Sequence, residues 1–468
     1  MLVDDRPLVL PVGVGEGAEA LIREARRRTL RRRLRGVGVL LIVGVVGAFV
    51  YDRGFDSHPV ARASFGPAPL ANLRAFHGHG ILAFVSKGRL WVLDGAAGTL
   101  TAVSAPSDQA SDPQFSPNGR WLSYAVRIPS GAGEIWLARA DGMGPRRVAA
   151  NLIAQANWLP DGRLLTGRWI LRVAASGTVT RVDSTPQDIS SVSPDGHDYA
   201  FASSNLVNFA NQPSKGEARL EVSSSIDGAR TTWYEDRITS APKTGVHGDY
   251  VLWAQALPYH EGLLFQLDPG GSDSAVVDGV NLYEIKRAGA RPVKLAVTVG
   301  AALSIGPHGT FAITAGGNRY AWQTKSVETC LAAAARCSPV HTKPGMLSFE
   351  PAWSTSSDTL VLVEAPSSTT TNFYQPTLRH WYASHTLWVL RHGASAPSRI
   401  SGTAGADAPT WSADGKSLIY EADDGLWLLP NLVSMPIRIA APLFPPSDWP
   451  SYYGQIGWAS QFAWLSRS

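Results

Sequence analysis

Residues 115 to 124 read Phe-Ser-Pro-Asn-Gly-Arg-Trp-Leu-Ser-Tyr, and this segment predicts the fold because its pattern recurs along the chain. An aromatic residue ends one extended segment, proline and asparagine form a turn, and glycine takes the positive φ that the turn requires. The residues that follow, Trp121 to Val126, predict a second strand and therefore a hairpin. Related copies follow at residues 158–163, 192–197, 305–310 and 411–416, with a decayed copy at 353–358.

The unit built on this turn is predicted to have four strands. In the first copy a third strand is expected at Glu134 to Ala140 and, after an Asp-Gly turn, a fourth at Arg146 to Ala149. Four short antiparallel strands cannot bury both of their faces alone, so units of roughly 40 residues must stack on one another. The sequence therefore predicts an all-β protein, a β-propeller of four-stranded antiparallel blades.

Two incomplete fragments predict how the ring closes. Strands are expected at Ile81 to Ser86, Arg89 to Asp94 and Thr99 to Ser104, but no first strand precedes them. Conversely, Gln461 to Leu465 is a strand that no hairpin follows. Pairing the two fragments in one blade would remove two exposed strand edges.

Counting the units gives eight blades, with seven or six as alternatives. Besides the composite blade, blades start near Asp112, Gln155, Asp188, Val246, Leu303, Glu350 and Asp407. The unit at Val246 lacks the Pro-Asp-Gly turn and is inferred from its four expected strands. If it belongs to its neighbours, the ring has seven blades.

The repeats resemble those of the TolB-like β-propeller family, a WD40-like group whose repeat is an aromatic residue, Ser-Pro-Asp-Gly and a strand. The resemblance covers most of the chain after about residue 75. It implies the propeller fold, commonly with six blades in that family. The small domain that precedes the propeller in TolB is not recognisable here, so the resemblance does not extend to TolB's own role.

The charge distribution argues against a nucleic-acid partner. The formal net charge is +4, but residues 1–35 alone hold nine arginines and five acids, which leaves 33 basic and 33 acidic residues in the remainder. The repeat region is therefore neutral and has no overall basic footprint. Arginine outnumbers lysine and alanine is common, which favours a bacterial origin with a GC-rich genome.

The N-terminal segment is predicted to be a membrane anchor. After the basic tail, Gly36 to Tyr51 contains sixteen residues without a charge. At about 1.5 Å per residue this run is slightly short for a hydrocarbon core of about 30 Å, and Arg35 and Arg53 can snorkel to make up the difference. An arginine cluster before such a run holds the N-terminus in the cytoplasm.

The predicted organisation has four parts. These are a basic cytoplasmic tail at 1–35, a single-pass signal anchor at 36–52, a proline-containing spacer at 53–75, and a propeller at 76–468 outside the bacterial cytoplasmic membrane. A buried helix is the alternative interpretation of the apolar run. Cleavage after Ala63 is the alternative to anchoring, because Ala61 and Ala63 have the small side chains that a signal peptidase reads.

The only two cysteines, Cys330 and Cys337, are separated by six residues. Outside the cytoplasm an oxidising compartment favours a local disulfide between them. A zinc site is not expected, because no Cys-x-x-Cys motif or histidine spacing accompanies the pair. No metal and no cofactor is predicted elsewhere in the chain.

Acidic residues precede the turn aromatic in several blades. The first strand of a propeller blade lines the central channel, so these carboxylates could ring one mouth of it and hold a cation or a basic peptide. The alternative is that acids simply begin strands and accept backbone hydrogen bonds. The residues are Asp112, Asp188, Glu350 and Asp407.

A long insertion at residues 366–385 departs from the repeat and is rich in aromatic residues. Loops on a rigid scaffold often carry recognition, and Tyr and Trp are favoured anchors. The alternative is a loop that folds its aromatics onto its own blade. The four side chains, expected to be exposed if the loop is a binding site, are Phe373, Tyr374, Trp381 and Tyr382.

The sequence lacks the catalytic motifs that would assign an enzyme class. It has no Gly-x-Ser-x-Gly elbow, no P-loop and no dinucleotide fingerprint. We therefore expect a binding or scaffold module for an envelope protein, peptide or glycan rather than an enzyme. The alternative is an envelope glycan or peptide hydrolase or lyase with carboxylates at the channel mouth.

Overall fold

The structure is a computed structural model that describes residues 68–466 with several gaps. The chain divides into two compact units, Met1–Ala63 and Ser64–Ser468, and all described residues belong to the second. The predicted anchor, Gly36 to Tyr51, lies outside the described residues. Within those residues no helix is long and apolar enough to cross a membrane. The gaps are 129–132, 152–155, 167–168, 185–188, 194–195, 207–213, 242–244, 257–261, 270–278, 300–302, 355, 371–374 and 444–460.

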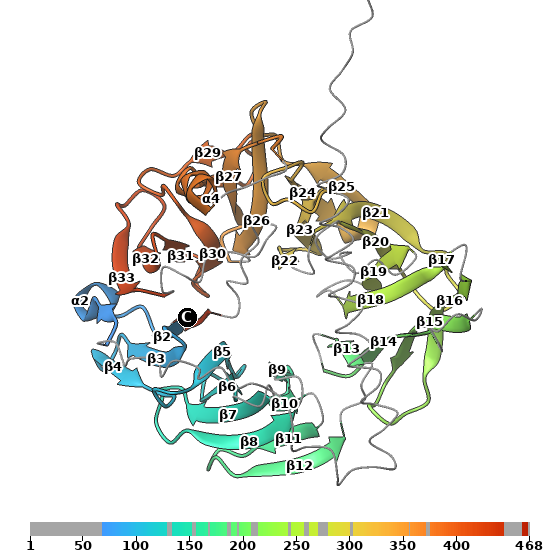
Figure 1. Ribbon diagram of the computed structural model, residues 1–468, viewed down its shortest axis with the longest axis horizontal. Coiled ribbons are helices and arrows are strands. Elements are labelled where there is room, and N and C mark those ends of the chain that lie inside the picture. Colours follow the sequence, from blue (N-terminus) through green and yellow to red (C-terminus); the bar gives the residue numbers. More distant parts are fainter. Residues whose placement is uncertain are drawn as a thin grey trace, which may run out of the picture. The chain divides into compact units, whose positions relative to one another are not determined.

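The strands form antiparallel units, here called blades, that follow one another around a ring (Figure 1). Blade 1 holds β34 (Phe462–Leu465), β2 (Ile81–Ser86), β3 (Arg89–Asp94) and β4 (Thr99–Ala102). Blade 2 holds β5 (Gln109–Phe115), β6 (Trp121–Arg127), β7 (Gly133–Arg139) and β8 (Arg146–Asn151). Blade 3 holds β9 (Ala156–Trp158), β10 (Arg163–Thr166), β11 (Trp169–Val173) and β12 (Val179–Ser184). Blade 4 holds β13 (Ile189–Val192), β14 (Tyr199–Leu206), β15 (Ser214–Ser223), β16 (Thr231–Ala241) and the short β17 (Gly245–His247).

The second half of the ring repeats the same arrangement. Blade 5 holds β18 (Asp249–Ala256), β19 (Leu263–Pro269), β20 (Val280–Ile285) and β21 (Val293–Thr298). Blade 6 holds β22 (Ser304–Ile305), β23 (Thr310–Ala315), β24 (Ser326–Leu331) and β25 (Arg336–Pro339). Blade 7 holds β26 (Met346–Ser354), β27 (Thr359–Pro366), β28 (Thr386–Arg391) and β29 (Ser398–Arg399). Blade 8 holds β30 (Asp407–Trp411), β31 (Leu418–Ala422), β32 (Gly425–Leu429), β33 (Ile437–Ala441) and β1 (Leu70–Ala71).

The strand pairing matches a count of eight blades. Blades 5 and 6 belong to one eight-stranded sheet, in which the described pairing between them is short: the pair Thr298 and Ala315, with Gly316 N–H donating to Val297 O and Val299 N–H donating to Thr314 O. Each half of that sheet is a four-stranded unit like the others. The unit inferred without a Pro-Asp-Gly turn is blade 5, whose first strand begins at Asp249.

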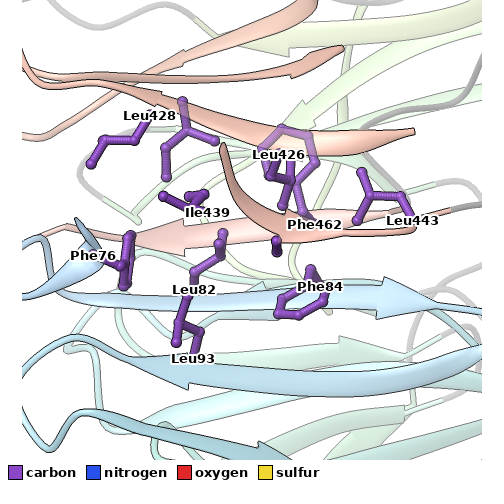
Figure 2. Close-up of a cluster of buried hydrophobic side chains, with 11 residues drawn as sticks. Phe76, Leu82, Phe84, Leu93, Leu426, Leu428, Ile439, Leu443 and Phe462 are labelled. Atoms are coloured by element: carbon purple, nitrogen blue, oxygen red, sulfur yellow. The ribbon is translucent and has the colours of Figure 1, made fainter. Parts of the chain in front are cut away.

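The two ends of the repeat region meet in blade 1. Strand β34 pairs with β2, so that Phe462 lies opposite Phe84. Both side chains enter a buried cluster that also contains Leu82 and Leu93 of blade 1 and Leu426 of blade 8 (Figure 2). The composite blade predicted from the two sequence fragments is therefore present, and it removes the edges that each fragment would expose.

Residues 70–75, which the sequence analysis assigns to the spacer, pack against the propeller. Leu70 and Ala71 already pair with β33 of blade 8, and Phe76, at the end of the short helix α2 (Leu73–Phe76), is fully buried. The hydrophobic pattern of these few residues is too short to signal a strand from sequence. Their structure depends on the neighbouring edge of blade 8.

Hydrophobic cores fill the seams between neighbouring blades. Seven seams have such a cluster among the described residues. At the seam between blades 3 and 4 the described part of the chain has no such cluster. There the guanidinium of Arg163 donates to the hydroxyl of Tyr199 and lies 6.0 Å from its ring centroid.

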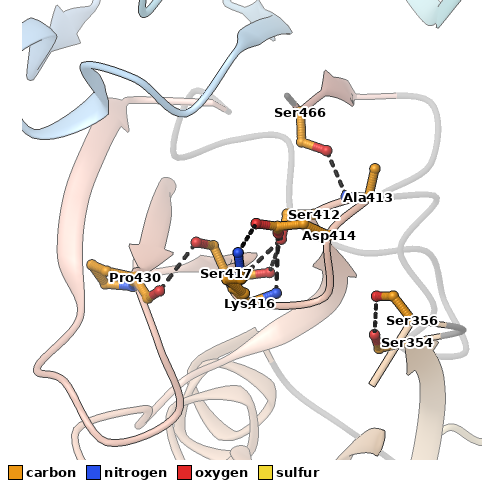
Figure 3. Close-up of polar contacts among 9 residues, drawn as sticks. All are labelled: Ser354, Ser356, Ser412, Ala413, Asp414, Lys416, Ser417, Pro430 and Ser466. Atoms are coloured by element: carbon orange, nitrogen blue, oxygen red, sulfur yellow. Dashed lines mark hydrogen bonds and ion pairs between the residues drawn. The ribbon is translucent and has the colours of Figure 1, made fainter. Parts of the chain in front are cut away.

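The repeated turn is held by its own polar side chains (Figure 3). The Oγ of Ser412 donates to Asp414 at 2.6 Å and accepts from the backbone N–H of Ser417 at 2.9 Å. In the first copy, Ser116 Oγ accepts from the N–H of Trp121 at 3.0 Å. The glycines of both turns have φ of 66°. These residues therefore form turns and leave little polar capacity for a ligand.

Candidate functional site

The longer connections of the blades lie at one end of the ring. In an antiparallel four-stranded blade, the link from the second to the third strand and the link to the next blade emerge at the same end. We call this end the insert face. In blade 7 the link carries helix α4 (Gln375–Ala383), and in blade 6 it comprises residues 316–325. The repeated turns join first and second strands, so they lie at the opposite end.

Next to α4, blades 7 and 8 enclose a buried group of titratable side chains. His385 precedes β28 and Asp407 begins β30, and the two are 0% and 2% exposed. His385 Nδ1 and Asp407 Oδ1 are 2.8 Å apart. Glu421 lies opposite Asp407 on β31. We call the following set, in which Glu350 is partly exposed and the others are buried, the acid–histidine cluster: Glu350, Tyr382, His385, Asp407 and Glu421.

Burial dominates the protonation of this cluster. Burial, reinforced by Asp407, raises the pKa of Glu350 to about 8. Burial also raises the pKa of Glu421 to about 10, with Asp407 and Asp424 adding repulsion. The pKa of Tyr382 is raised for the same two reasons, burial and nearby acids. Both glutamates are therefore protonated at neutral pH, and the cluster can hold protons that ordinary carboxyls release.

His385 is neutral for the same physical reason. Burial lowers its pKa to about 3, against a smaller opposite effect of Glu350. Its Nε2 has no hydrogen-bond partner among the described residues. If Asp407 is ionised, Nδ1 donates to it and Nε2 remains an acceptor. The pair has the chemistry of an oriented general base, but neither of the two grooves described below includes a residue of the cluster.

The four acids predicted to ring the channel do not occupy one equivalent position. In β5, β26 and β30 a bulge places a residue with positive φ before a proline. Those residues are Asp112, Glu350 and Ala408, with φ of 53°, 48° and 50°. Asp407 lies one position earlier, where it reaches His385 instead. Asp188 lies outside the described residues.

Glu350 satisfies backbone groups of the neighbouring blade. Its Oε2 accepts from the N–H of Ala408 at 2.6 Å. Similar links from one first strand to the next are made by Ser190 Oγ, which accepts from Ala254 N–H at 2.7 Å, and by Ser304 Oγ, which accepts from Trp353 N–H at 2.6 Å. Asp112 instead accepts a bond from the adjacent serine. Both acids lie inside their strands, so neither begins a strand as the alternative interpretation expects, but Glu350 does accept a backbone hydrogen bond.

The aromatic insertion does not expose the two side chains that the structure describes. Trp381 and Tyr382 lie on α4 and are 6% and 7% exposed. Trp381 packs against Trp322 and its Nε1 donates to the carbonyl of Pro366 at 2.9 Å. The expectation of an exposed aromatic loop is wrong for these residues, because the helix turns them onto blade 7. Phe373 and Tyr374 lie outside the described residues.

A groove of about 630 Å³ lies among blades 5, 6 and 7. One wall is the outer strand of blade 5 at residues 295–297, and another is the glycine pair Gly316 and Gly317. Met346 and Leu347 of β26 contribute apolar surface. None of its lining residues is aromatic. A second groove of about 350 Å³ lies at the seam of blades 3 and 4 and includes Arg163 and Tyr199.

Lys325 lines the first groove but is fully engaged. It is 6% exposed, and its Nζ donates to the carbonyls of Asn318, Tyr320 and Gln323 at 2.6, 3.0 and 2.8 Å. Burial lowers its pKa to about 8. Three donors on an ammonium match three acceptors here, so Lys325 shapes the loop of residues 317–324.

Two further sequence predictions concern cysteines and metals. Cys330 of β24 and Cys337 of β25 form a disulfide across the 3₁₀ turn Ala332–Ala334. Among the residues that the structure describes, no group of three or more His, Cys, Asp or Glu side chains could hold a metal ion.

Comparisons with known proteins find only distant similarity. No family model and no curated protein matches it. Solved structures that match include TolB from Acinetobacter baumannii, with 12% identity over 77% of this chain and 64% of TolB and a TM-score of 0.34. A eukaryotic initiation factor has 13% identity, coverage of 78% and 96%, and a TM-score of 0.44. An oligogalacturonate lyase in complex with manganese has 11% identity, coverage of 81% and 89%, and a TM-score of 0.40. At this similarity none of these proteins supports an argument about the function of this chain.

Proposed function

We propose that this chain is a membrane-anchored binding protein of the bacterial cell envelope, whose propeller holds an extended peptide segment at its insert face. The anchor is the uncharged run Gly36 to Tyr51 behind its arginine-rich tail. The proposed binding role rests on the groove of about 630 Å³ beside strand β21. The partner is a peptide or a segment of an envelope protein.

The groove favours a peptide because it offers a strand edge. Strand β21 pairs with β20 along its length. On its other side Thr298 pairs with Ala315, Val297 O accepts from Gly316 N–H at 2.9 Å and Val299 N–H donates to Thr314 O at 3.0 Å, so the part of the strand without a described partner on that side is Val293–Ala296. Residues 295–297 of this strand line the groove. An added strand could use the main-chain groups of such an edge, with its side chains on Leu295, Met346 and Leu347.

The composition of the groove disfavours a glycan. Its lining lacks the aromatic side chains on which sugar rings commonly stack. The ammonium of Lys325 already donates to three backbone carbonyls. Gly317 leaves space at the groove wall, because an added Cβ there would meet only Val297 Cγ1, at 3.9 Å. A ligand that presents backbone hydrogen-bonding groups and apolar side chains fits this surface better.

A groove-filling variant tests the proposal. A Cβ at Gly317 would meet only Val297 Cγ1, at 3.9 Å, so the position accepts a side chain, and Gly317→Trp adds bulk at the groove wall. The matched control is Met143→Trp, at a turn residue of blade 2 that is 58% exposed. Peptides selected from a displayed random library on the full chain are synthesised and titrated against the three proteins. We expect at least a roughly tenfold loss of affinity for Gly317→Trp, about 1.4 kcal/mol, and none for the control.

Two results would count against the groove. If no peptide is enriched over a blank surface, the protein does not bind extended peptides. If enriched peptides bind Gly317→Trp as tightly as the unaltered chain, their site lies elsewhere on the propeller.

The second candidate function is an envelope glycan or peptide hydrolase or lyase. It is favoured by the oriented His385–Asp407 pair beside Glu350, whose raised pKa suits a general acid. Substrate would have to reach a cluster that α4 and blade 8 enclose. Turnover of cell-wall fragments by the full chain that is abolished in His385→Gln, while the protein stays folded, would favour this enzyme over the binding protein.

A further inference from the structure

One carboxyl group lies inside the groove among blades 5, 6 and 7. Glu328 of β24 lines this groove and is partly buried. Within the described part of the chain its carboxyl takes part in no hydrogen bond and no ion pair. Burial raises its pKa, and no basic group of the described residues offsets that effect. A partly buried carboxylate without a protein partner depends on water or on a ligand for its hydrogen bonds.

Strand geometry places Glu328 on the side of blade 6 that faces blade 5. Successive residues of a strand point to opposite faces of the sheet. Val327 packs in the cluster shared with blade 7, whereas Cys330 packs in the cluster shared with blade 5. Glu328 lies on the same face as Cys330, and Ile313, its partner on β23, also belongs to the cluster shared with blade 5. The carboxyl group is therefore directed toward blade 5.

The open edge of β21 borders the same groove. Val293–Ala296 of this strand has no described partner on its outer side. Leu295 and Ala296 line the groove and pack against the cluster shared by blades 5 and 6. A peptide strand added at this edge would continue the sheet of blade 5, and every second side chain of the peptide would point toward blade 6. Those side chains would lie on the side where Glu328 is found.

The groove offers no basic side chain of its own to pair with Glu328. Lys325 is the one other charged residue among those that line it. Its ammonium already donates to three backbone carbonyls. Lys294 of the open edge is exposed and does not line the groove. The groove therefore presents a negative charge to its ligand.

We propose that Glu328 selects the bound segment by forming an ion pair with a lysine or arginine side chain of the peptide. This inference rests on the proposed peptide-binding function and is independent of the membrane anchor. A peptide that covers the carboxylate removes its water, which costs free energy unless a charged donor takes the place of that water. A basic side chain supplies the donor, a neutral side chain leaves the carboxylate poorly paired, and an acidic one adds repulsion.

A double-mutant cycle between chain and peptide tests the ion pair. Peptides are selected from the displayed random library on the full chain and synthesised with acetylated N-termini and amidated C-termini, so that only side chains carry charge. A second set of peptides has the enriched basic residue replaced by glutamine. Both sets are titrated against the unaltered chain and Glu328→Gln. The matched control is Glu134→Gln, at a carboxyl of blade 2 that lines neither groove.

We expect the selected peptides to be enriched in lysine or arginine at one position. Neutralising either partner alone, in the chain or in the peptide, should weaken binding by roughly tenfold or more, because each change removes a charge-assisted hydrogen bond. Neutralising both should weaken binding no further than one change does, because the two residues act as a pair. The Glu134→Gln chain should bind as tightly as the unaltered chain.

Failure of the ion pair and failure of the groove give different results. If no peptide is enriched, or if the peptides bind Gly317→Trp as tightly as the unaltered chain, the proposed groove fails and the inference fails with it. If Gly317→Trp abolishes binding but the peptides lack an enriched basic residue, the groove stands and the ion pair is refuted. The ion pair is also refuted if Glu328→Gln weakens the basic and the glutamine peptides equally, since Glu328 would then affect only the shape of the groove.

Discussion

Replacing Glu421 by glutamine should stabilise the folded protein at neutral and alkaline pH. Glu421 is 5% exposed, and burial beside Asp407 and Asp424 raises its pKa from 4.5 to about 10. An acid whose pKa is higher in the folded than in the unfolded chain takes up a proton on folding. The free energy of unfolding therefore falls as pH rises from about 4.5 toward 10.

The magnitude follows from the pKa difference. One pKa unit corresponds to about 1.4 kcal/mol, so keeping Glu421 protonated at pH 7 costs about 3 kcal/mol relative to pH 4.5. Glutamine has nearly the same shape and no proton to take up. We expect Glu421→Gln to raise the free energy of unfolding by about 2 to 3 kcal/mol at pH 7 and to change it little near pH 4.5. The lowered pKa of His385 makes the free energy of unfolding rise with pH between about 3 and 6.5. This effect is the same in the unaltered chain and in Glu421→Gln, so it cancels in the comparison.

Urea unfolding of the full chain at several pH values between 4.5 and 8.5 measures the effect. The control is Glu134→Gln, because a hydrogen bond from Arg147 lowers the pKa of that carboxyl. Removing the Glu134 carboxyl should therefore not raise the free energy of unfolding at high pH. If the unaltered chain and Glu421→Gln lose stability with pH at the same rate, then Glu421 does not bind its proton in the folded state and the reasoning fails.

Three further predictions concern the fold. Phe462→Ala should lower the free energy of unfolding by about 3 kcal/mol, because it empties a buried position of the closing strand, and urea unfolding checks this. Gly316→Ala should be strongly destabilising, since its Cβ would lie 2.1 Å from a carbonyl oxygen, whereas Gly317→Ala should change the melting temperature little. Reducing the Cys330–Cys337 disulfide should cost about 2 kcal/mol for so short a loop, and unfolding with and without reductant measures it.

The repeat alone predicted much of the architecture because turn chemistry is local. Pro, Asp or Asn, and Gly set a turn through their own φ preferences and side-chain bonds, as Ser412 and Asp414 do. Strands predicted at Ile81 to Ser86 and Arg89 to Asp94 agree with β2 and β3. The closing strand was also predictable, because two unpaired fragments each imply a missing partner.

The sequence was less informative where a register shift of one residue changes the face of the sheet on which a side chain lies. Asp407 looked equivalent to Glu350, yet the bulge of β30 begins at Ala408. Successive strand residues point to opposite faces, so this shift sends Asp407 toward His385. Likewise Trp381 is buried because α4 folds back onto blade 7, a contact that local sequence does not encode.

The four-stranded repeat, the composite blade and the candidate anchor follow from the sequence alone, since each depends on neighbouring residues or on composition. Which side chains meet depends instead on the tertiary fold. It brought Glu350, His385 and Glu421, which are far apart in the chain, into one cluster around Asp407. Raised pKa values and exposed patches depend on burial, and burial is a property of packed blades rather than of any single stretch of sequence.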